Sequence, residues 1–151
     1  MCKGVDTMPF ETPLPPGFFD VSDITATVRE YQGIPPTTII RTDQPWDVLV
    51  KWTTSGVLTG WIAGKWDLHL YLESMGPGDD YELTDPNEHE MPLTPGVSPI
   101  SYEYHPDVKG GVVSPGQYSL VFTVRYINAS GKPDQMAGHW IGPILQFYKP
   151  T

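Results

Sequence analysis

Two short runs in the middle of the chain alternate large apolar side chains with more polar ones. They are residues 48–52 (VLVKW) and residues 66–72 (WDLHLYL). A period of two places every second side chain on the same face of an extended strand. Antiparallel strands that are buried on one side only have this pattern. The chain is therefore predicted to be all-β, with Trp52 and Trp66 in its core.

The other apolar segments predict further strands and no helix. Alternation or enrichment in β-branched residues marks residues 21–29, 37–42, 100–105, 118–126 and 144–148. The chain has 17 prolines and 15 glycines, and most of them fall between these segments, where they mark turns. Residues 74–96 are predicted to be the longest connection. About seven or eight irregularly spaced strands favour an antiparallel two-sheet sandwich.

Three features together resemble immunoglobulin-like β-sandwich modules over residues 37–148. They are the strand that ends at Trp52, the strand that begins at Trp66, and the sequence Pro115-Gly116-Gln117-Tyr118. In such modules a turn and a tyrosine open a late strand, which the resemblance implies for Tyr118. The chain has one cysteine, so the bridging cysteine pair of antibody domains is absent. The resemblance implies an architecture, and an architecture does not fix a function.

The first twenty residues differ from the rest because they are rich in proline and lack periodicity. We expect residues 1–20 to be an extended Pro-rich arm and residues 21–151 to be the sandwich domain. The arm carries four large apolar side chains, Phe10, Leu14, Phe18 and Phe19. It is either a disordered leader or a segment that packs on its own domain or on a neighbouring subunit. These four residues are the predicted partner-binding residues.

The charge pattern excludes several classes of partner. The net charge is −9, and residues 66–108 hold ten acidic residues and no lysine or arginine. Such a sector repels nucleic acid and anionic lipid. No run of about 18 apolar residues predicts a membrane span. The first residues lack the features of a secretory signal, so we expect a cytoplasmic protein or an exported mature form whose signal was removed.

Metal binding is a secondary hypothesis. The acidic stretch at residues 79–90 offers Asp79, Asp80, Glu82 and Asp85 as oxygen ligands for calcium, although their spacing does not match an EF-hand. A solvated acidic loop is the alternative. The four histidines, at positions 69, 89, 105 and 139, lack the spacing of a zinc motif, so zinc would require ligands that converge across strands. No cofactor is therefore expected, with Ca²⁺ as the alternative.

No sequence motif for catalysis is present. The chain contains no Gly-x-Ser-x-Gly elbow, P-loop or Gly-x-Gly-x-x-Gly. We therefore predict a non-enzymatic structural or interaction module. It would be an acidic subunit of a protein assembly that contacts a protein partner, or copies of itself, through the arm or a sheet edge.

The alternative function is that of a carbohydrate-binding, lectin-like module, with calcium as an assisting ion. It would use Trp61 and Trp140 as exposed aromatic platforms for a sugar. Trp140 lies in residues 138–143, which are predicted to be a turn whose glycines leave its ring accessible.

Overall fold

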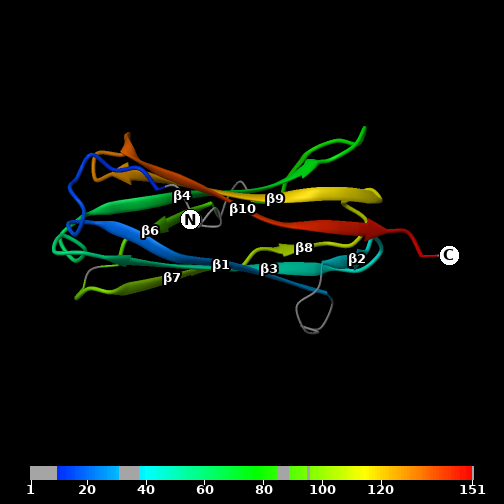
Figure 1. Cartoon of the computed structure of the whole chain (residues 1–151), viewed down its shortest axis with the longest axis horizontal. Helices are drawn as coiled ribbons and strands as arrows, with labels where there is room; N and C mark the ends of the chain where they lie inside the picture. Colours follow the sequence, from blue (N-terminus) through cyan, green and yellow to red (C-terminus); the bar gives the residue numbers. More distant parts are fainter. Residues whose placement is uncertain (1–9, 31–37, 85–88, 95, 151) are drawn as a thin grey trace, which may run out of the picture.

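The computed structural model describes residues 10–30, 38–84, 89–94 and 96–150, apart from the side chains of residues 23, 134 and 135. These residues form ten β-strands and no helix, which confirms the all-β prediction. The strands form two sheets that stack as two layers of a sandwich (Figure 1). No helix in this part of the chain is long and apolar enough to cross a membrane.

The larger sheet has six strands, in the order β2-β10-β9-β4-β5, with β6 also paired to β4. Their bounds are β2 (Ile39–Arg41), β4 (Gly64–Ser74), β5 (Tyr81–Glu82), β6 (Glu90–Pro92), β9 (Gly116–Asn128) and β10 (Pro133–Tyr148). The pairings in this sheet are antiparallel, except that β2 runs parallel to β10.

The smaller sheet has four strands and is antiparallel. Its order is β1-β3-β7, with β8 also paired to β3. The bounds are β1 (Asp20–Glu30), β3 (Trp46–Ser55), β7 (Ile100–Tyr104) and β8 (Asp107–Val108). In Figure 1 this sheet lies below β4, β9 and β10.

The core lies between the two sheets and is rich in aromatic side chains. Trp52 on β3 and Trp66 on β4 are 1% and 0% exposed, which confirms their predicted place in the core. Their rings meet edge to face across the sandwich, with centroids 6.5 Å apart. Tyr102 stacks on Trp52 at 5.6 Å, and Phe122 contacts the same ring at 5.6 Å. The alternating apolar residues of 48–52 and 66–72 are therefore the inward faces of two strands, and both faces pack into the same core.

Tyr118 opens β9 in the way that the sequence predicts. Its side chain is 1% exposed, and its hydroxyl donates a hydrogen bond to the backbone carbonyl of Ser114 at 2.8 Å. Burial raises the pKa of the Tyr118 hydroxyl, with a further contribution from Tyr81. The hydrogen bond pins the turn at residues 114–117 to the start of the strand.

Two predictions about the elements are wrong. Residues 138–143 lie inside β10 and are not a turn, and the register of β10 against β9 shifts between Ile141 and Ile144. This irregularity accommodates Gly142 and Pro143 within a strand. Residues 74–96 are not a plain connection, because they contain the short strands β5 and β6.

From residue 10 onward the arm packs on its own domain. Phe19 is 0% exposed and stacks on Trp66, and Phe10 meets Trp66 edge to face at 6.2 Å. Glu11 exchanges two backbone hydrogen bonds with Ala137 of β10, at 2.8 and 3.1 Å. Packing on the same domain was one of the alternatives that the sequence left open.

Candidate functional site

Polar side chains gather on the outer face of the six-stranded sheet. Because Trp66, Leu68 and Leu70 fill the core, the intervening Asp67 and His69 point away from it. The strand register shows which residues of β9 and β10 lie beside Asp67 and His69. Asp67 lies opposite Arg125 of β9, which lies opposite Ala137 of β10, while His69, Thr123 and His139 form the next row.

These rows border a groove of about 530 Å³ on the sheet surface. Its lining residues are Glu11, Asp67, His69, Tyr71, Thr123, Val124, Arg125, Ala137, Gly138 and His139. The arm supplies the first of them, and strands β4, β9 and β10 supply the rest. Burial raises the pKa of the Tyr71 hydroxyl, helped by the negative charges of Glu82 and Asp67. Tyr71 therefore presents a neutral phenol to the groove at neutral pH.

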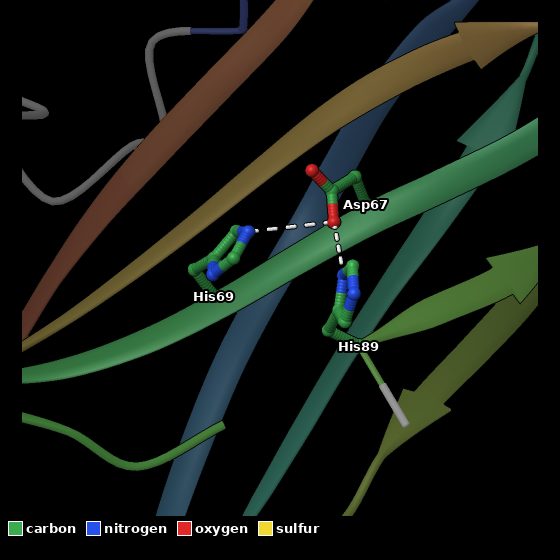
Figure 2. A group of neighbouring side chains, drawn as sticks. All are labelled: Asp67, His69 and His89. Atoms are coloured by element: carbon green, nitrogen blue, oxygen red, sulfur yellow. Dashed lines mark hydrogen bonds and ion pairs between the residues drawn. The ribbon is translucent and has the colours of Figure 1, made fainter. Parts of the chain in front are cut away.

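A compact cluster lies beside this groove, and we call Asp67, His69 and His89 the outer-face cluster (Figure 2). Asp67 Oδ1 lies 2.6 Å from His89 Nδ1 and 3.4 Å from His69 Nε2. The two imidazole rings stack with centroids 5.5 Å apart. One nitrogen of each ring is thus aimed at the same carboxylate oxygen.

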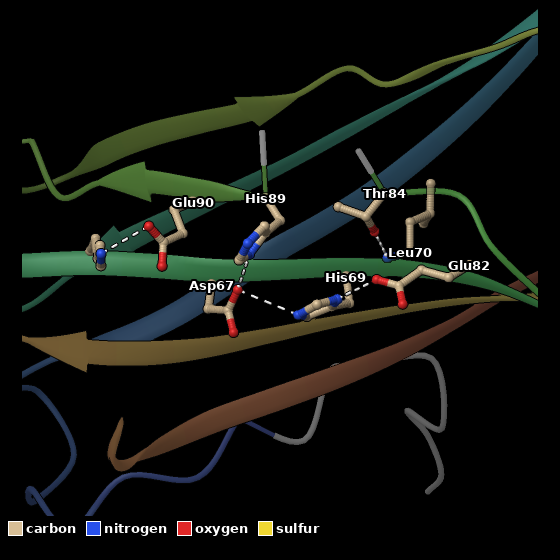
Figure 3. A network of polar contacts seen from close by, with 8 residues as sticks. Asp67, His69, Leu70, Glu82, Thr84, His89 and Glu90 are labelled. Atoms are coloured by element: carbon tan, nitrogen blue, oxygen red, sulfur yellow. Dashed lines mark hydrogen bonds and ion pairs between the residues drawn. The ribbon is translucent and has the colours of Figure 1, made fainter. Parts of the chain in front are cut away.

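Glu82 holds the other side of the His69 ring. Its Oε2 lies 2.5 Å from His69 Nδ1, so His69 is placed between two carboxylates (Figure 3). The flanking segments are fixed to β4 by short hydrogen bonds. The Leu68 N–H donates to the His89 carbonyl at 2.7 Å, and the Leu70 N–H donates to Thr84 Oγ1 at 2.6 Å. The backbone of β4 therefore positions the whole network.

The described residues contain a second histidine–carboxylate group, on the four-stranded sheet. It consists of Asp47, His105 and Asp107. Arg29 enters this group, with Nε at 3.0 Å from Asp47 Oδ1 and a terminal nitrogen at 2.9 Å from His105 Nε2. A guanidinium already balances this carboxylate, which makes the group a poor site for another cation.

Exposed apolar side chains also lie on the outer face over β2 and β10. We call Ile39, Ile141, Ile144 and Tyr148 the apolar patch; their side chains are 57%, 62%, 52% and 40% exposed. Their neighbours in the two strands, such as Ile40, Leu145 and Phe147, point into the core and are buried. All four patch residues therefore lie on the same face of the sheet.

Among the described residues, the predicted calcium ligands do not gather into one group. Asp79 and Asp80 are exposed, and Asp80 accepts a hydrogen bond from the Ser74 backbone N–H at 2.8 Å. Glu82 turns instead to His69. Asp85 lies outside the described residues.

The two predicted platform tryptophans differ in exposure. Trp61 is 85% exposed in the turn between β3 and β4. Trp140 is only partly exposed and packs against the core, with Gly142 directly beneath its ring. Trp140 pairs with Phe122 of β9, and Phe122 pairs with Leu70 of β4, six positions along that strand from Gly64. Trp140 therefore lies within β10, whereas Trp61 lies in the turn before β4.

The outer-face cluster was missed by sequence reasoning. The period-two pattern of residues 66–72 already puts Asp67 and His69 on one outward face, and this signal was available. His89 comes from a segment that β6 brings alongside β4, and a strand of three residues has no periodicity to detect. Glu82 is on β5, which has the same difficulty.

Comparisons with known proteins show no family for this chain. No protein-family model matches the chain, and no curated protein matches it. Among solved structures, it is similar to a Niemann-Pick type C2 protein from the Japanese carpenter ant, with 13% identity and a TM-score of 0.43. The match covers 87% of this chain and 93% of the other. A likeness at this level does not assign a function.

Proposed function

We propose that this chain is a non-enzymatic interaction module that binds a different protein through the outer face of its six-stranded sheet. The observation that carries this proposal is the apolar patch, Ile39, Ile141, Ile144 and Tyr148, gathered on that face over β2 and β10. Contiguous exposed apolar side chains bordered by polar groups are typical of protein-binding surfaces.

Charge favours a partner of a different kind over a second copy. The β4–β5 side of the same face carries the exposed carboxylates Glu73 and Glu82, in the sector that has no lysine or arginine from Trp66 to Val108. Two copies with a net charge of −9 each repel one another. The matching partner places apolar side chains on the patch and basic side chains over β4 and β5.

The arm and the sheet edge are less accessible to a protein partner than the outer face is. Phe10, Leu14 and Phe19 pack against the chain's own core, which leaves Phe18, 41% exposed, as the most accessible of the four arm residues. The edge strand β1 has a register irregularity between Ser22 and Thr25. Bulges of this kind discourage edge-to-edge pairing. These contacts are secondary to the outer face in the proposal.

A site-specific photo-crosslinker at position 141 tests the proposal in cells of the source organism. We expect a crosslinked adduct with one protein from position 141 and none from position 57, because Val57 is 68% exposed but lies in the turn after β3, outside the apolar patch. Ile144→Lys should abolish the adduct without lowering the melting temperature, since Ile144 is about half exposed. High salt should lower the amount of crosslinked adduct, because it screens the charges between the two proteins.

Three results would contradict the proposal. One is an adduct with the mass of two copies of this chain. Another is equal crosslinking from positions 57 and 141, and the third is an adduct that survives Ile144→Lys. The exposed ring of Trp61 is the basis of the carbohydrate alternative. A glycan array probed with and without chelator tests that alternative.

A further inference from the structure

We propose that the outer-face cluster, Asp67, His69 and His89, is a binding site for one divalent transition-metal ion such as Zn²⁺. The inference is independent of the proposed protein-binding surface, since it rests on the three side chains and the distances between them. Two imidazoles and one carboxylate are a common ligand set for zinc and similar ions, with a water completing the coordination.

The first argument is the spacing of the ligand atoms. One ligand atom from each of Asp67, His69 and His89 lies within 4.8 Å of the other two. Ligand atoms bound tetrahedrally to zinc at about 2.1 Å lie about 3.4 Å apart. The distance from Asp67 Oδ1 to His69 Nε2 is 3.4 Å. The distance to His89 Nδ1 is 2.6 Å, so admitting an ion requires this ring to move by less than about 1 Å.

The second argument is the orientation of His69. Glu82 Oε2 lies 2.5 Å from His69 Nδ1, where it accepts the proton on that nitrogen. Nε2 of the same ring faces Asp67 Oδ1 at 3.4 Å, so it is the nitrogen that the ring presents to the cluster. A carboxylate on the remote nitrogen is also the usual outer partner of a metal-bound histidine.

The third argument is the charge around the cluster. Asp67 and Glu82 supply two carboxylates, and Lys65 is engaged by Glu90 at 2.8 Å. Arg125 lines the groove, but in the described part of the chain the short polar contacts of the Asp67 carboxylate are made with the two histidines. The group of Asp47 and His105 differs because Arg29 occupies it. Of the two groups, the outer-face cluster is the one suited to a cation.

Zinc titration of the tag-free, chelator-treated full chain tests the inference. Cys2→Ser serves as the parent protein, so that the thiol cannot supply a ligand. We expect saturable binding of one Zn²⁺ per chain, measured by competition with a chromophoric chelator. His89→Gln and Asp67→Asn should each weaken binding at least tenfold, and Glu82→Gln should weaken it less than they do.

Two matched histidine variants serve as controls. His105→Gln alters the group that contains Arg29, and His139→Gln alters a histidine in the same groove that lies two strands from His69. Both should bind zinc like the parent. Circular dichroism melts of every variant confirm folding, and Zn²⁺ should raise the melting temperature of the parent but not that of His89→Gln.

Either of two results would overturn the inference. One is the absence of saturable zinc binding by the parent, which would mean that the cluster is only a hydrogen-bonded network. The other is a His89→Gln variant that binds zinc as tightly as His105→Gln does.

Discussion

Phe19 shows how a single residue ties the N-terminal segment to the core. Its side chain is 0% exposed and stacks on Trp66 with ring centroids 6.1 Å apart. Phe18, its neighbour, is 41% exposed. The sequence presents two adjacent phenylalanines in a Pro-rich stretch, and their alternation alone does not say which one is buried. The arrangement of the arm over β4 decides it.

Replacing Phe19 should therefore be costly. We expect Phe19→Ala to lower the free energy of unfolding by about 3–5 kcal/mol, because it leaves a cavity against Trp66. The matched change Phe18→Ala should cost less than about 1 kcal/mol. Denaturant unfolding of both variants measures the difference. Equal losses would show that the arm is not packed as described.

The individual strands were largely predictable, because a one-sided strand of five or more residues leaves a clear period of two. The predicted segments at residues 21–29, 100–105 and 118–126 correspond to β1, β7 and β9. Strands β5 and β6, with two and three residues, leave no such pattern and were missed. They form because the edge of β4 that does not pair with β9 has backbone groups free to accept another strand. That edge exists only in the assembled sheet.

Strand β10 was predicted only in its C-terminal part. Residues 138–143 contain two glycines and a proline, which normally break a strand. Strand β10 continues past these residues because it pairs with β9 on both sides of a register shift. The groove residues on this part of β10 depended on that continuation.

Gly64 opens β4 in a conformation that favours glycine. Its φ is +132°, and a Cβ built there would lie 2.3 Å from the Ile127 carbonyl oxygen. We expect Gly64→Ala to lower the free energy of unfolding by about 2–4 kcal/mol through backbone strain and the clash with β9. Gly76→Ala, with no atom within 4 Å, should stay within about 0.5 kcal/mol of the parent. Thermal or urea unfolding of the two variants provides the test, and similar values would rule out the close approach.

The whole molecule has one core that both sheets share. Trp52 comes from the four-stranded sheet, and Trp66 comes from the six-stranded sheet. Their contact at 6.5 Å means that neither sheet can lose its packing without exposing the other. We therefore expect the domain to unfold as one cooperative unit.

Urea unfolding followed by two probes tests this cooperativity. Tryptophan fluorescence reports the shared core, and far-ultraviolet circular dichroism reports the strands of both sheets. The two curves should coincide in midpoint and slope. A first transition seen only by circular dichroism would mean that one sheet unfolds separately.

The sequence by itself determined the all-β class, the inward faces of β3, β4 and β9, and the central place of Trp52 and Trp66. These properties follow from a local period of two, which any extended segment expresses regardless of its neighbours. Only the tertiary structure decided that Asp67, His69, Glu82 and His89 meet, and that exposed apolar side chains of β2 and β10 share one face. These residues lie on or beside different strands, and the pairing register that brings those strands together depends on the whole sheet.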